Sequence, residues 1–141
     1  MVGTTNNWSG TGDDIVRVNT MGVWTVLTAA EAAGVQRVVL CSSDSVVGFT
    51  VMSGGLKPPD YLPIDAAHPL RPTDPYAVSK LLGEQIGHSF VTRGKLEVIM
   101  LRPVFILYPE MEGEVQARAA NPGTYRGVTA SFEIDTTDIA P

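Results

Sequence analysis

The apolar positions of this chain fall into two long stripes with helical spacing, and short β-rich runs follow each of them. Across residues 13–33 the apolar side chains recur every three or four positions, which predicts a helix that Gly34 ends. A second stripe covers residues 75–93. Asp74 suits the N-cap of this helix, and Pro75 suits its first turn, where a missing N–H costs nothing. We therefore expect two amphipathic helices.

Each helix leads into a short apolar run that is typical of a buried parallel strand, at residues 37–41 and 97–101. The order strand, long loop, helix, strand predicts a right-handed βαβ crossover and hence an α/β fold. The loop, residues 49–74, contains five prolines and is long enough to be functional or mobile. Further along, we expect a short helix at 111–120 and an extended piece at 132–135.

Composition narrows the class of protein without identifying it. The 141 residues carry a formal net charge of −5, and no basic run argues for a nucleic-acid or anionic-membrane surface. The single cysteine, Cys41, cannot form an internal disulfide, which favours a reducing compartment and a cytoplasmic location. No apolar segment is long enough to span a bilayer. His68 lacks a second ligand at metal-binding spacing, so we expect a surface-loop histidine and no metal site.

Two groups of polar residues are candidates for chemistry. Tyr76 and Lys80 lie four positions apart, so on a helix they share one face. An ammonium beside a phenol favours ionisation and makes Tyr76 a plausible general acid/base, although such a pair alone is also typical of a solvated helix face. Ser42 and Ser43 follow the first strand, where ligands bind in open α/β sheets and where turn-forming serines are also common.

Five segments now occur in an order that is specific to one family. They are Asn19-Thr20-Met21-Gly22, residues 39–48 with Ser42-Ser43, the approach from Ile64 to Pro75-Tyr76-Ala77-Val78-Ser79-Lys80 with Glu84, Leu101-Arg102-Pro103, and residues 133–140. Together they resemble the extended short-chain dehydrogenase/reductase superfamily, in its NAD-dependent epimerase/dehydratase branch. The resemblance covers residue 13 to the end of the sequence and implies a Rossmann-like parallel sheet with flanking helices.

The resemblance also implies roles for individual residues. Tyr76 would be the catalytic acid/base, and Lys80 would hold the nicotinamide ribose and lower the pKa of Tyr76. Ser43 would hydrogen-bond the substrate hydroxyl or carbonyl. Asn19 would support the helix and a proton-relay water.

The implied cofactor is NAD or NADP, contacted by Tyr76 and Lys80 and flanked by Pro103 and Val104. The implied activity is that of an epimerase, dehydratase or reductase acting on a sugar-like or other hydroxyl or carbonyl substrate. Members of the family usually pair two such helices across a two-fold axis, so we expect a homodimer through residues 13–33 and 75–93.

Other features depart from the family pattern. The glycine-rich turn that seats a dinucleotide pyrophosphate is missing, and residues 9–12 do not replace it, because no strand precedes them and Asp13 and Asp14 follow. We therefore interpret residues 1–141 as a partial, incomplete Rossmann-like domain that enters the substrate lobe at about 109–141. A non-catalytic or truncated fragment that keeps the fold without binding dinucleotide remains the alternative. Val47 and Phe105 replace the family's usual Tyr and Asn, which leaves the substrate open.

Overall fold

The computed structural model describes residues 11–48, 58–120 and 133–135, and it divides the chain into two compact units, Met1–Arg102 and Pro103–Pro141. The first unit contains α1 (Gly12–Ala32), β1 (Arg37–Cys41), the short 3-10 helix η1 (Asp44–Val47), α2 (Pro75–Thr92) and β2 (Glu97–Leu101). The second contains β3 (Phe105–Leu107), the 3-10 turn η2 (Pro109–Met111), α3 (Glu112–Ala120) and β4 (Glu133–Asp135).

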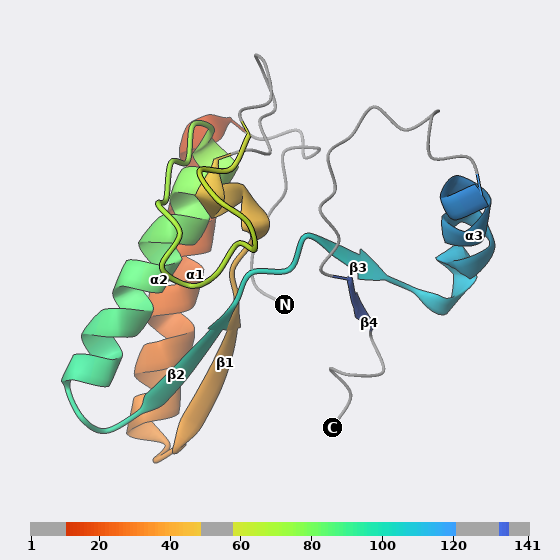
Figure 1. The fold of residues 1–141 in the computed structure, drawn as a ribbon. Helices are drawn as coiled ribbons and strands as arrows, with labels where there is room; N and C mark the ends of the chain where they lie inside the picture. The colour runs from red at the N-terminus through yellow and green to blue at the C-terminus, as the bar shows by residue number, and fades with distance from the viewer. Residues whose placement is uncertain (1–10, 49–57, 121–132, 136–141) are drawn as a thin grey trace. The chain divides into compact units, whose positions relative to one another are not determined.

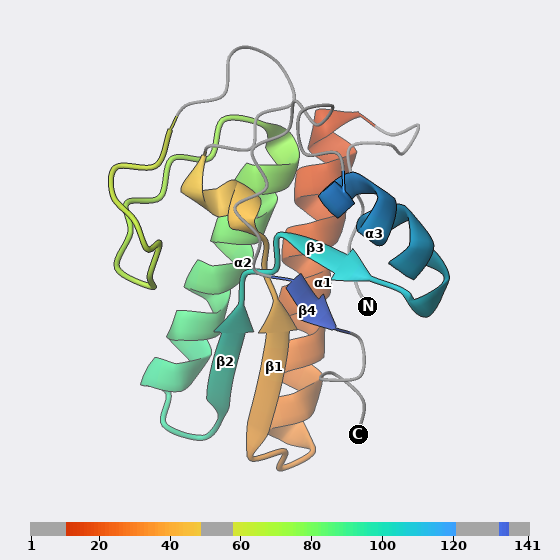
Figure 2. The same cartoon turned by 45° about the vertical axis from the view of Figure 1, so that its right-hand side comes forward.

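The first unit is a parallel strand pair with two helices on one face. β1 and β2 pair in register from Arg37 opposite Glu97 to Cys41 opposite Leu101. Figures 1 and 2 show α1 and α2 side by side behind this pair. The expected α/β fold, with strand, loop, helix and parallel strand in that order, is confirmed for this unit.

Local sequence explains where both helices begin. The Asp74 side chain accepts a hydrogen bond from the Ala77 backbone N–H at 2.9 Å, as expected of an N-cap before a first-turn proline. At α1 the cap is Thr11. The Asp14 backbone N–H donates to the Thr11 hydroxyl, and the Thr11 backbone N–H donates to the Asp14 carboxylate. These caps satisfy backbone donors that a helix leaves unpaired in its first turn.

The apolar core lies between the helices and one face of the strand pair. Leu27 and Phe90 are fully buried and pack with Leu96. Partly buried side chains from both helices and both strands surround them: Val23, Ala30, Val38, Leu40, Ile86 and Val98. The helical stripes predicted from the sequence thus form the core-facing sides of α1 and α2.

On the opposite face of the strand pair the described side chains of the strands are exposed, which corrects the expectation of fully buried strands. Val39 and Ile99 lie opposite each other in the register and are 57% and 44% exposed. The reason is that successive side chains of a strand alternate between faces, and the described helices of this unit cover one face alone.

His68 is buried, not a surface residue as the sequence suggested. It is 3% exposed, its Nε2 accepts a hydrogen bond from the Asp60 backbone N–H, and its Nδ1 lies 3.0 Å from the Pro69 carbonyl oxygen. Asp60 in turn accepts both ends of the Arg71 guanidinium at 2.6 Å. The described part of the long loop, from residue 58, is therefore held by its own polar side chains; residues 49–57 lie outside the described part of the chain.

In the second unit β3 and β4 pair in parallel, with Phe105 opposite Glu133. The expected short helix and terminal extended piece correspond to α3 and β4. The remaining residues of the terminal family-like segment, 136–140, and residues 1–10 lie outside the described part of the chain. No helix within the described residues is both long and apolar enough to cross a membrane.

Gly48 ends η1 in a left-handed conformation that is critical for the loop above the strands. Its φ is 89°, and a Cβ here would collide with the Arg71 carbonyl oxygen. The Arg71 backbone N–H donates to the Val46 carbonyl at 3.0 Å, which brings the two segments together.

We expect Gly48→Ala to lower the free energy of unfolding by about 2 kcal/mol or more, because it adds a steric clash to the cost of a positive φ. Gly34→Ala is the matched control, since Gly34 has a φ of 72° and no atom lies within 4 Å of the position that its Cβ would take. Urea unfolding of both variants separates the cost of the steric clash from the cost of the positive φ. Equal losses for the two variants would contradict a close contact at Gly48.

Candidate active site

The candidate site begins at the carboxyl end of β1. Ser43 is the N-cap of η1, and its Oγ accepts hydrogen bonds from the Ser45 backbone N–H at 3.2 Å and from the Ser45 hydroxyl at 2.8 Å. The Ser43 hydroxyl donates to the Asp44 carboxylate at 3.1 Å. All three side chains are buried. The turn after β1 therefore fixes the Ser43 hydroxyl by local bonds, as expected for serines that also form a turn.

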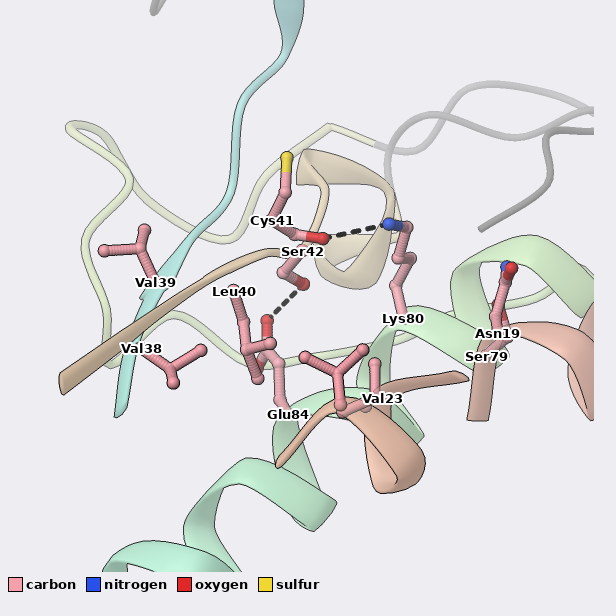
Figure 3. A pocket seen from close by; sticks show the side chains of 12 residues that line it. Asn19, Val23, Val38, Val39, Leu40, Cys41, Ser42, Ser79, Lys80 and Glu84 are labelled. Atoms are coloured by element: carbon pink, nitrogen blue, oxygen red, sulfur yellow. Dashed lines mark hydrogen bonds between the residues drawn. The ribbon is translucent and has the colours of Figure 1, made fainter. Parts of the chain in front are cut away.

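Tyr76 and Lys80 lie one turn apart near the start of α2, and both are half-buried. The Lys80 Nζ lies 5.6 Å from the centre of the Tyr76 ring and donates a hydrogen bond to the Cys41 carbonyl oxygen at 2.9 Å. This bond joins α2 to the last residue of β1 (Figure 3). The ammonium thus stands beside both the phenol and the strand end.

The Ser43 hydroxyl acts on the Tyr76 phenol and lowers its pKa, so the turn after β1 and the start of α2 influence each other. Even so, the pKa of Tyr76 is raised above 10.0, because burial of the phenol outweighs the lowering effect of the Ser43 hydrogen bond. The nearby Asp44 and Asp74 carboxylates raise this pKa further. The phenol is therefore protonated at neutral pH in this arrangement.

Lys80 is not among the groups that act on the pKa of Tyr76 in this structure, so the expected lowering by its ammonium stays a prediction. Burial also acts on the lysine, because it lowers the pKa of Lys80 below 10.5. In this structure the ammonium makes its hydrogen bond to a backbone carbonyl instead. Burial therefore disfavours the charged forms of both groups.

Asn19 contacts the helix that carries Tyr76. Its Nδ2 donates to the Ser79 hydroxyl at 2.8 Å, and that hydroxyl donates to the Tyr76 backbone carbonyl at 2.7 Å. Asn19 and Ser79 are both buried. Asn19 therefore links α1 to the first turn of α2 through one intervening hydroxyl.

A pocket of about 250 Å³ lies between α1, β1 and α2. Valine and leucine side chains line much of it, while Asn19, Ser42, Ser79, Lys80 and Glu84 contribute polar groups (Figure 3). Tyr76 and Ser43 are not among its lining residues. The pocket thus meets the candidate site at Lys80.

A second polar cluster, which sequence reasoning did not assign to the site, adjoins the pocket. The Glu84 carboxylate accepts two hydrogen bonds from Arg102, at 2.8 and 2.7 Å, and one from the Ser42 hydroxyl at 2.5 Å. The available sequence signal was the position of Glu84, four residues after Lys80 and within a largely apolar helix face. Its partners come from other elements, so spacing alone could not identify them.

Pro103 and Val104 are the first residues of the second unit. Their expected place beside a nicotinamide stays a prediction. Within the described residues, no three His, Cys, Asp or Glu side chains are placed to hold a metal ion.

The chemistry of this donor set fits one end of a nicotinamide nucleotide. The Lys80 Nζ can bond ribose hydroxyls as readily as it bonds the Cys41 carbonyl, and the Tyr76 hydroxyl lies next to it on α2. Both groups stand at the carboxyl end of a parallel strand, where α/β sheets bind nucleotides.

We expect the phenol of Tyr76 to ionise above pH 10. Its ionisation is measured as the difference between the ultraviolet titration curves of the wild type and of Tyr76→Phe. Because its pKa is raised in the folded chain, stability is fully present below the pKa of the unfolded phenol and falls as pH rises past it. Tyr76→Phe should therefore lose less stability than the wild type above pH 10. A phenol midpoint at or below 10.0 would contradict the dominance of burial.

Solved structures that share this fold include a short-chain dehydrogenase/reductase superfamily protein. One such protein from Agrobacterium tumefaciens, with bound NAD, superposes with a TM-score of 0.69 at 23% identity, covering 98% of this chain and 51% of that one. UDP-glucose 4-epimerase from Brucella ovis, in complex with NAD, gives a TM-score of 0.62 at 23% identity over 79% of this chain and 33% of that one. These likenesses establish the Rossmann-like fold.

Sequence comparison gives two relatives of known activity. L-arabinose 1-dehydrogenase (NAD(P)(+)) of Haloferax volcanii is 32% identical over 67% of this chain, and uronate dehydrogenase of Pseudomonas syringae pv. tomato is 32% identical over 64%. The chain spans 39% and 30% of the length of these two relatives. The model of the NAD dependent epimerase/dehydratase family matches residues 2–121, so this chain belongs to that NAD-dependent family.

Proposed function

We propose that this chain carries the catalytic residues of an NAD(P)-dependent enzyme that acts at a hydroxyl- or carbonyl-bearing carbon of a sugar-like substrate. The observation that carries the proposal is the placement of the Lys80 ammonium 5.6 Å from the centre of the Tyr76 ring, beside the turn whose Ser43 hydroxyl lowers the pKa of that phenol. These three side chains come from β1's end and α2, and they supply a proton acceptor, an orienting hydroxyl and a cation.

In the proposed reaction, the Tyr76 oxygen takes the proton from a substrate hydroxyl while hydride leaves the same carbon. The nicotinamide, when bound, supplies the acceptor for that hydride. The Ser43 hydroxyl holds the reacting oxygen beside Tyr76, and Lys80 would hold the ribose hydroxyls of the cofactor. Asn19 and Ser79 keep the first turn of α2 in place during the step.

A raised pKa has a direct consequence for this chemistry. A protonated Tyr76 is ready to act as an acid, and it acts as a base once an added positive charge stabilises the phenolate. The site is thus set for carbonyl reduction, and cationic oxidised nicotinamide would favour the reverse direction. Epimerisation would use both directions in turn, returning hydride to the other face of a ketone.

The names of the relatives support a sugar as the substrate. L-arabinose and uronates are the substrates named for the two relatives at 32% identity, and UDP-glucose 4-epimerase of Rhizobium leguminosarum bv. trifolii matches at 29% identity. The first two are free sugars or sugar acids, and the third is a nucleotide sugar. We propose a free sugar or sugar acid, in agreement with Phe105 in place of the family's asparagine.

The expected activity is reduction of NAD or NADP in the presence of L-arabinose or a uronate, followed by nicotinamide absorbance. Tyr76→Phe should lower kcat about 100-fold or more, because it removes the proton acceptor and keeps the ring. Tyr61→Phe is the matched control: that hydroxyl bonds Asp65 in the loop, outside the site. Full activity in Tyr76→Phe would refute the catalytic role, and no turnover by the wild type would favour the non-catalytic fragment.

We further propose a homodimer through residues 13–33 and 75–93. Large apolar side chains on both helices are exposed, among them Met21 at 56% and Leu82 at 41%. A second copy that covered them would remove this apolar surface from water. The proposed location is the cytoplasm, supported by the single cysteine, and the proposed partners are small molecules.

Sedimentation velocity tests the dimer. We expect the wild type to sediment as a dimer, and Leu82→Glu to shift it to monomer, because a charge at the proposed interface has no partner there. Val35→Glu is the control, since Val35 is 39% exposed and lies just beyond the first helix. A monomeric wild type at tens of micromolar concentration or above would overturn the proposal.

A further inference from the structure

Glu84 is the most deeply buried carboxylate of the polar clusters around the pocket. Its side chain is 3% exposed, and it accepts three hydrogen bonds. Two come from the Arg102 guanidinium as a bidentate pair, at 2.8 and 2.7 Å, and one comes from Ser42 at 2.5 Å. Such a charged, forked arrangement fixes direction as well as distance.

The three partners belong to three different elements. Glu84 is on α2, one turn after Lys80; Ser42 directly follows β1; and Arg102 directly follows β2. The Ser42 backbone N–H also donates to the Leu101 carbonyl at 2.7 Å, which extends the strand pairing to this level. Glu84 is therefore the point at which the helix is bonded to both strand ends (Figure 3 shows its bond to Ser42).

Ser42 connects this cluster to the proposed catalytic groups. It is the residue before Ser43, whose hydroxyl acts on the pKa of Tyr76, and Tyr76 lies on the same helix that carries Glu84. A closed loop of contacts results: from Tyr76 to Ser43, through the backbone to Ser42, to Glu84, and along two turns of α2 back to Tyr76. A shift of the strand end relative to the helix would change the contact between Tyr76 and Ser43.

We infer that Glu84 is a positioning residue: it holds Ser42, and through it Ser43, in register with Tyr76 and Lys80. This inference rests on the proposed function for its catalytic meaning, while the geometry that it describes can be tested without substrate. A neutral amide at this position would turn a donor toward the Arg102 fork, so at most part of the bonding would survive. The bond that would be lost is the one from the Ser42 hydroxyl to the side chain at position 84.

The test compares the wild type with Glu84→Gln, reading the phenolate absorbance of Tyr76 as the difference from the matching Tyr76→Phe protein. A rapid pH jump records ionisation before alkaline unfolding. We expect the Tyr76 midpoint to rise by about one pH unit in Glu84→Gln, because the Ser43 hydrogen bond that favours the phenolate is lost. Simple removal of a negative charge would lower the midpoint, so the direction of the shift separates positioning from electrostatics.

Two further variants complete the test. Glu31→Gln is the matched control: it removes the charge from another interhelical pair, that of Glu31 in the last turn of α1 with Arg93, the C-cap residue of α2, at 3.2 Å. It should lower stability without moving the Tyr76 midpoint. Ser42→Ala keeps the pair between Glu84 and Arg102 intact and should raise the midpoint in the same direction as Glu84→Gln, so it carries the test if Glu84→Gln does not fold.

The inference is overturned if the Tyr76 midpoint is unchanged or lowered in Glu84→Gln. If Glu84→Gln does not fold, the same result in Ser42→Ala overturns it. So does an equal rise in Glu31→Gln, which would indicate general loosening. In an active preparation, Glu84→Gln should reduce kcat at least as much as kcat/KM and shift the pH profile of kcat upward. Absence of turnover in the wild type, with the midpoint shift present, would refute the proposed function and leave the positioning by Glu84 standing.

Discussion

The close approach of α2 to the strand pair is the constraint on which the rest of the first unit depends. At Gly87 a Cβ would lie 2.8 Å from the Met100 Cε and 3.2 Å from the Leu40 Cδ1, so the helix backbone lies almost directly on the side chains of β1 and β2. This proximity lets side chains at the other end of α2 reach the end of β1. Lys80 bonds the Cys41 carbonyl for that reason.

Two kinds of interaction maintain this arrangement, and they differ in what they contribute. The apolar contacts of Leu27, Phe90 and Leu96 remove surface from water and supply the stability. The buried pair of Glu84 and Arg102 loses hydration energy that its mutual attraction and hydrogen bonds offset, so it contributes little net stability. What it contributes is direction, since a forked pair fits only one placement of helix and strand end.

Burial affects the proposed chemistry in a way that distance alone does not show. The same packing that brings Tyr76 to Ser43 removes water from the phenol and the ammonium, and both charged forms become less favourable. The hydrogen bond to Ser43 partly compensates at the phenol, and the bond to the Cys41 carbonyl holds the ammonium. Charges brought by bound molecules would therefore have a large effect on the protonation of this site.

The open face of the strand pair has the same origin as the core. Alternation along β1 and β2 sends Leu40 and Val98 toward the helices, and Val39 and Ile99 away from them. Each strand is apolar on both faces, which is typical of a strand covered on both sides in parallel α/β sheets. The chain's match to about half of a larger Rossmann-like structure is consistent with this two-sided pattern.

The sequence by itself determined the elements, because their causes are local. Helical spacing of apolar residues, the cap at Asp74, the stop at Gly34 and the β-rich runs at 37–41 and 97–101 each act within a few positions. The order of motifs was enough to identify the family that the comparison confirmed. The pairing of Tyr76 with Lys80 on one helix face was likewise a matter of spacing.

Only the tertiary structure decided which polar groups meet and which charges are favoured. Glu84 joins Ser42 and Arg102 across 42 and 18 positions, and no periodicity links them. His68 is buried because Asp60 and Pro69 fold around it. The pKa of Tyr76 depends on how much water the whole fold removes, a sum over many distant residues, and for that reason its direction could not be predicted from the spacing of Tyr76 and Lys80.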